Sequence, residues 1–111
     1  MTRHPATPHP ALQVLGLLAM MACAGPALAN KALAEKQGCL GCHAVATQLV
    51  GPAYRAVAAK YAGEAGAVAV LAQSIRNGGG GKWGETPMPP QKQVSEADAG
   101  RLARWVLDGA K

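Results

Sequence analysis

Two cysteines and a histidine stand together in the segment Cys39-Leu40-Gly41-Cys42-His43, the strongest chemical signal in the chain. C-x-x-C-H is the attachment motif for c-type haem. Each thiol can add across a haem vinyl group to form a thioether, and the adjacent histidine is then held close enough to ligate the iron. The motif therefore predicts one haem attached covalently through Cys39 and Cys42, with His43 as an axial ligand.

Three other interpretations of this segment are open. Structural zinc sites use four ligands, whereas Cys39, Cys42 and His43 have no second pair downstream. A thioredoxin-like redox pair belongs in a βαβ context, and the chain carries helical signals instead. An ordinary disulfide would leave unexplained why so few large apolar side chains are available for a core. Haem attachment accounts for the segment best.

The second axial ligand is predicted from the segment 85–91, "ETPMPPQ". Within residues 30–111, Met88 is the only methionine and His43 the only histidine. Histidine and methionine are a recognised axial pair of haem iron, and this pair raises the reduction potential. The flanking prolines restrict the backbone, which reduces the freedom that ligation of a weak thioether would have to remove. Ordinary core packing of Met88 is the alternative.

The first 29 residues have the pattern of a secretory signal peptide that is cleaved. A basic start precedes the apolar run 11–25, and Ala27-Leu28-Ala29 places the cleavage before Asn30. The run has 15 residues, whereas a membrane-spanning helix needs about 20. Lipidation at Cys23 is an alternative, although Met20-Met21 make a poor lipobox. We expect a soluble periplasmic protein whose single domain comprises residues 30–111.

Residues 30–111 carry the signals of an all-α fold. We expect four short helices: one capped by Asn30 over residues 31–37, one with Pro52 in its first turn over 52–62, one around the apolar stripe Val68, Leu71, Ala72 and Ile75, and one opening at Ser95. A segment rich in Gly and Pro, residues 78–93, forms a long loop before the last helix. Residues 30–111 include four aromatic side chains and no phenylalanine, so a bulky apolar cofactor would complete a small core.

The segments "GCLGCHAVATQLVGPAYRAVAAKYAG", "IRNGGGGKWGETPMPPQ" and "LARWVL" resemble the short class I monohaem cytochromes c. The closest likeness is to the five-fifty-one type of bacterial periplasms, over all of residues 30–111. The resemblance implies the class I cytochrome c fold, four helices wrapped around one covalent haem. It also implies a carrier of single electrons, not an enzyme, that donates to nitrite reductase or a terminal oxidase.

The resemblance also assigns roles around the haem. It implies that the carbonyl of Pro52 accepts a hydrogen bond from His43, which would set the tautomer of the ligand. It implies that the indole N–H of Trp83 donates to a haem propionate. Gln91 stands near the Met88 sulfur where relatives often have asparagine, and Ser74 stands where many have a basic residue near a propionate.

The charges favour a protein partner over nucleic acid. Without Arg3, 10 basic and 6 acidic residues remain, and the basic ones are scattered singly. Nucleic-acid binding would need a clustered basic patch. We expect a monomer without stable membrane contact, which meets a reductase, an oxidase or another cytochrome or copper protein. Its docking surface would contain apolar residues near the haem anchors, namely Leu40, Leu49, Val50, Pro89 and Pro90.

Two other functions are open. Met88 could dissociate readily, which would make the protein a haem enzyme or gas sensor of peroxidase-like character. The chain could also be the small cytochrome subunit of a larger oxidoreductase complex.

The exported protein should begin at Asn30 and carry one haem. Mass spectrometry of the protein purified from the periplasm should give the mass of residues 30–111 plus one haem. A diacylglycerol group on Cys23 would contradict the expected cleavage and place the protein on a membrane.

Overall fold

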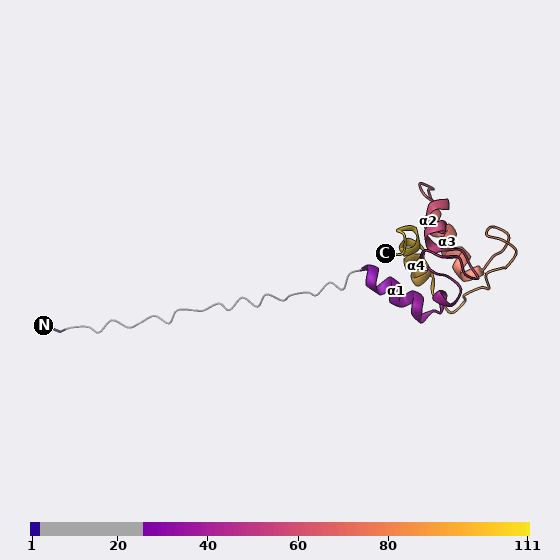
Figure 1. Cartoon of the computed structure of the whole chain (residues 1–111). Coiled ribbons are helices and arrows are strands. Elements are labelled where there is room, and N and C mark those ends of the chain that lie inside the picture. The colour runs from indigo at the N-terminus through magenta and orange to yellow at the C-terminus, as the bar shows by residue number, and fades with distance from the viewer. Residues whose placement is uncertain (3–25) are drawn as a thin grey trace.

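The computed structural model describes residues 1–2 and 26–111 of the chain. Four α-helices, α1 (Pro26–Lys36), α2 (Tyr54–Lys60), α3 (Ala67–Asn77) and α4 (Glu96–Leu107), are joined by loops, and a short 3₁₀ helix, η1 (Cys39–Gly41), follows α1 (Figure 1). This part of the chain has no strand, so the predicted all-α class is confirmed. None of its helices is long and apolar enough to cross a membrane. Most of the expected leader, including Cys23, lies outside the described residues.

The third and fourth helices begin and end as their local signals predict. Gly78 ends α3 with a φ of 70°, a left-handed conformation that glycine adopts without strain. Ser95 caps α4, because its hydroxyl accepts a hydrogen bond from the Asp98 N–H at 3.1 Å. These two caps place the ends of the long loop close to the helices that flank it.

The predicted starts of the first two helices are wrong. α1 begins at Pro26, so Asn30 lies inside the helix and does not cap it. Proline suits a first helical turn, and the Ala-Leu-Ala that follows it favours helix. α2 begins at Tyr54 and ends at Lys60, so it is shorter than predicted and excludes Pro52. The N–H of Tyr54 is bonded to the Ala44 carbonyl at 3.0 Å, so a tertiary contact decides where this helix begins.

The core is built around α4, which packs against each of the other three helices. In Figure 1, α4 lies between α1 and the pair formed by α2 and α3. The predicted buried side chains of α4, Leu102, Trp105 and Val106, are all less than 9% exposed. Of the apolar stripe predicted on α3, Leu71 is buried, whereas the side chains of Val68, Ala72 and Ile75 are only partly buried.

The loop between α3 and α4, residues 78–93, is called the methionine loop below (orange in Figure 1). Its two sides meet in an isolated antiparallel bridge. The N–H of Met88 donates to the Gly79 carbonyl at 2.7 Å, and the N–H of Gly79 donates to the Met88 carbonyl at 3.1 Å. Farther along, the N–H of Gln91 donates to the Ile75 carbonyl at 3.0 Å. The second side of the loop is therefore tied to the end of α3.

Candidate functional site

One cavity of about 330 Å³ opens inside the fold, and every site residue predicted from the sequence borders it. The predicted residues that line this cavity are Cys39, Cys42, His43, Pro52, Trp83, Met88 and Gln91. The rest of the wall is mostly apolar and comes from all parts of the core, including Val57, Leu71, Ile75, Leu102 and Val106. A slot with apolar walls and two thiols, an imidazole and a thioether at its border fits a covalently held haem.

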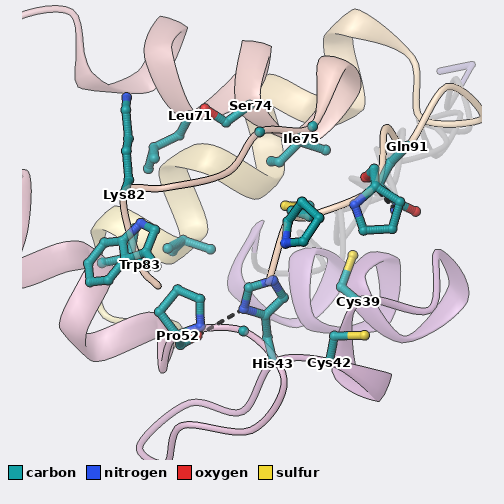
Figure 2. Close-up of a pocket in the computed structure, with 18 of the residues that line it drawn as sticks. Cys39, Cys42, His43, Pro52, Leu71, Ser74, Ile75, Lys82, Trp83 and Gln91 are labelled. Carbon is teal, nitrogen blue, oxygen red and sulfur yellow. Dashed lines mark hydrogen bonds between the residues drawn. The ribbon is translucent and has the colours of Figure 1, made fainter. Parts of the chain in front are cut away.

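Figure 2 shows that the labelled residues come from different sides of the cavity. Cys39, Cys42 and His43 lie on the segment around η1, and Leu71, Ser74 and Ile75 face them from α3. Lys82 and Trp83 border a third side, on the methionine loop. Segments far apart in the sequence therefore converge on one space.

His43 is held by a hydrogen bond to the backbone. Its Nδ1 lies 2.9 Å from the carbonyl oxygen of Pro52, as the dashed line in Figure 2 marks. A carbonyl oxygen can only accept, so Nδ1 carries the proton and Nε2 of the neutral ring keeps its lone pair. The nitrogen that a metal needs is thus the one left free. This geometry is the one that the resemblance implied for Pro52.

The faces of the His43 ring are also fixed, by two residues that the sequence analysis did not single out. The ring of Tyr54 stacks on it, with centroids 5.1 Å apart and planes 15° apart. Gly51 passes so close that a Cβ there would lie 2.8 Å from Nδ1 of His43. Tyr54 in turn meets Trp105 edge to face at 5.3 Å, which ties the histidine to α4. The dipeptide Gly51-Pro52 is a turn signal that could have drawn attention to Gly51.

Burial raises the pKa of two ionisable groups of this wall. It raises the pKa of the Cys39 thiol, although a backbone hydrogen bond opposes the shift. Burial also raises the pKa of Tyr54, and negative charge on Cys39 and Cys42 would raise it further. Both cysteines are free, and Cys42 is exposed. Within residues 26–111, no three His, Cys, Asp or Glu side chains are grouped as a metal site, in contrast to the four ligands of structural zinc.

Met88 borders the cavity from the methionine loop, and its side chain is partly buried. The backbone beside it is packed tightly against the end of α3. A Cβ on Gly78 would overlap the Met88 carbonyl and lie 2.8 Å from the Pro90 nitrogen. Only glycine permits this approach, which brings the methionine segment to the cavity edge.

The other predicted site residues make contacts of their own. Trp83 is 38% exposed, and Nζ of Lys60 lies 4.6 Å from its ring centroid in a cation–π contact. Gln91 donates from Nε2 to the Pro89 carbonyl at 3.0 Å, and its Oε1 accepts from Gln93 at 2.9 Å. The side-chain amide of Gln91 therefore links two other residues of the methionine loop and stabilises it. No local sequence pattern indicates the contact between Lys60 and Trp83.

Ser74 borders the cavity from α3. The resemblance implied that many relatives have a basic residue at this position. Its hydroxyl donates to the Val70 carbonyl one turn back, at 3.1 Å. The hydroxyl proton is thereby directed into the helix backbone and away from the cavity.

Comparisons with known proteins identify the family to which the chain belongs. The family model described as "Cytochrome c" matches residues 27–110. The chain is 50% identical over 91 residues to cytochrome c-552 of Hydrogenobacter thermophilus, which covers 82% of this chain and 92% of that protein. It is 48% identical over 100 residues to cytochrome c-551 of Pseudomonas aeruginosa, which covers 90% of this chain and 95% of the relative.

The fold is similar to a solved structure of the same kind. The crystal structure of wild-type cytochrome c552 of Nitrosomonas europaea superposes with a TM-score of 0.69 at 49% sequence identity. The superposition covers 70% of this chain and 96% of that chain.

Replacing Gly51 by alanine should disturb the histidine. The new methyl group would overlap the His43 ring, so either the ring or the segment that carries Pro52 has to move. Overpacking of this kind costs about 1–3 kcal/mol. Denaturant unfolding of the haem-loaded Gly51→Ala variant should show this loss of stability, and its visible spectrum should change.

The matched control is Gly41→Ala, because a Cβ on Gly41 meets nothing within 4 Å. Equal stability and unchanged spectra in both variants would contradict the close packing of Gly51 against His43.

Proposed function

The chain belongs to the cytochrome c family, and from this premise we propose that it is a periplasmic electron carrier whose haem iron is ligated by His43 and Met88. Like its relatives, it is a small electron-transfer protein with one covalent haem c, and it is not an enzyme. The iron of such a haem supplies a reversible change of one electron. Cys39 and Cys42 would provide the two thioether bonds.

The convergence of these four side chains on one apolar cavity is the observation that supports the proposal most strongly. His43 has its Nε2 free because Nδ1 donates to Pro52. Met88 reaches the same cavity from a segment tied to α3 rather than to η1. If His43 and Met88 both bound the iron, it would have no open site for a substrate, which would favour electron transfer over catalysis.

Trp83 and Gln91 would act beside the ligands. Trp83 borders the cavity, and no described side-chain hydrogen bond uses its indole N–H, which suits donation to a haem propionate. The Lys60 ammonium over its ring adds positive charge on the same side. Gln91 would stiffen the backbone beyond Met88 through its bond to Pro89.

The periplasmic location rests on the leader pattern of residues 1–29. Cleavage before Asn30 would leave residues 30–111 as the haem domain, and the family match covers all of these residues except Lys111. A leader that is removed on export, followed by a domain with the C-x-x-C-H motif for haem attachment, fits this division of the chain.

The partners would be other redox proteins, such as nitrite reductase, a terminal oxidase, or another cytochrome or copper protein. Leu49 and Val50 are 49% and 61% exposed, and Val50 borders the cavity. Pro89 and Pro90 are exposed beside Met88. Leu40 packs partly against the core, so it would contribute less. A small apolar surface of this kind suits brief encounters, which bury less than about 1,200 Å².

One alternative function differs from the proposal in the behaviour of Met88. A haem enzyme or gas sensor needs the thioether to leave the iron, whereas the bridge between Gly79 and Met88 holds the loop closed.

A permanent subunit of a larger complex would elute with that complex in gel filtration of a periplasmic extract, and a free carrier would elute as a monomer.

Replacing Met88 by alanine should keep the haem attached and open the sixth position. The reduced variant should bind carbon monoxide rapidly, while the unaltered protein should resist it. The reduction potential should fall, because the thioether favours ferrous iron. Spectra under carbon monoxide and potentiometric titration measure both effects.

Thr86→Ala is the control for this variant, since Thr86 lies in the same loop and borders the same cavity. Carbon monoxide binding as fast in the unaltered protein as in Met88→Ala would refute ligation by Met88 and support the enzyme or sensor alternative.

Placing a charge at Val50 should slow electron transfer to the partner. Val50→Asp would put an aspartate on the proposed docking surface, and a several-fold loss of the bimolecular rate is expected because interface charge mismatches are costly. Val70→Asp serves as the control, because Val70 is 41% exposed on α3 and does not border the cavity. Equal rates for the two variants would mean that electrons leave through another surface.

A further inference from the structure

Arg76 links the two ends of the methionine loop, although it does not border the cavity. It lies in the last turn of α3, and its side chain reaches the residues that lead into α4. Its Nε donates to the Val94 carbonyl at 3.1 Å, and its Nη1 donates to Oε1 of Glu96 at 3.1 Å. Among the side-chain hydrogen bonds of residues 26–111, these two are the ones that span the loop.

The two contacts of Arg76 differ in their surroundings. Val94 is the most buried large residue of the described chain, at 0% exposure, so the hydrogen bond to its carbonyl has a fixed and buried partner. The Glu96 side chain is 87% exposed, so solvent screens its ion pair with Arg76. The hydrogen bond to the Val94 carbonyl is therefore the contact that holds the base of the loop.

The two sides of the methionine loop differ in stiffness, so the restraint at Val94 reaches Met88 along only one of them. On the first side of the loop, Gly78 to Gly81 form a flexible run. On the second side, prolines surround Met88, and the N–H of Val94 donates to the Gln91 carbonyl at 3.1 Å. The segment from Met88 to Val94 is the stiffer of the two sides, so anchoring Val94 also restrains Met88.

We propose that Arg76 is a positioning residue for Met88, which keeps the weak thioether ligand in place by clamping Val94 to the end of α3. The inference rests on the proposed ligation of iron by Met88. Without the clamp, the segment 88–94 would depend on the backbone bonds of Gly79 and Gln91, and excursions of Met88 from the cavity would become more frequent.

The test is the rate at which Met88 leaves the iron of the ferric, haem-loaded protein. Imidazole is mixed with the protein at rising concentrations, and the plateau of the observed rate equals the dissociation rate of the methionine. For Arg76→Gln we expect a plateau roughly three to ten times higher, because a charged donor is lost from a buried carbonyl. Arg76→Lys keeps a charged donor and should recover part of the difference.

Two further variants separate the clamp from general effects of charge. Glu96→Gln removes only the screened ion pair and should change the plateau by less than about twofold. Arg101→Gln removes a comparable surface pair, with Asp98 at 3.7 Å inside α4, and should leave the plateau unchanged. The effect of Arg76→Gln should persist at high salt, because the contact that matters is a hydrogen bond.

A plateau for Arg76→Gln equal to that of Arg101→Gln would overturn the inference. So would a higher plateau in Glu96→Gln that equals the one in Arg76→Gln, since the ion pair would then be the restraint. Failure of the proposed function gives a different result, in which the unaltered protein itself shows no plateau and no sulfur ligand.

Discussion

The hydrogen bond from His43 to the Pro52 carbonyl is the interaction on which the rest of the site depends. It assigns the proton to Nδ1, leaves Nε2 free and sets the plane of the ring beside Tyr54. The helix α2 begins just beyond this carbonyl, at Tyr54. The absence of a side chain on Gly51 permits the approach. The protein backbone therefore orients the ring nitrogen that would bind the iron.

Met88, the proposed second ligand, is held in a different way. Met88 lies in a loop without helix or strand, and a thioether is a weak ligand, so the loop itself has to supply the order. Three contacts act on the backbone around the methionine: the bridge to Gly79, the close passage of Gly78 and the hydrogen bond from Arg76 to the Val94 carbonyl. A rigid histidine and a methionine held in place by its loop would together let the iron change charge while both ligands keep their positions.

The parts that could be predicted from the sequence are those with a local pattern. The cap at Ser95, the end of α3 at Gly78 and the convergence of Cys39 and Met88 on one cavity follow from motifs and periodicity. The start of α2 was misplaced because tertiary hydrogen bonds override the preference of proline for a first turn. The contacts of Arg76 and Lys60 join residues far apart in the chain, and no local pattern encodes them.

The same cavity also explains how so small a chain forms a core. Its walls include the buried faces of α3 and α4, so a bound haem would complete the apolar interior. The central claim is that Met88 and His43 ligate that haem, and X-ray absorption at the iron edge of the haem-loaded protein tests it most directly. We expect one sulfur neighbour among nitrogen neighbours in both oxidation states. Nitrogen or oxygen neighbours alone would contradict the account.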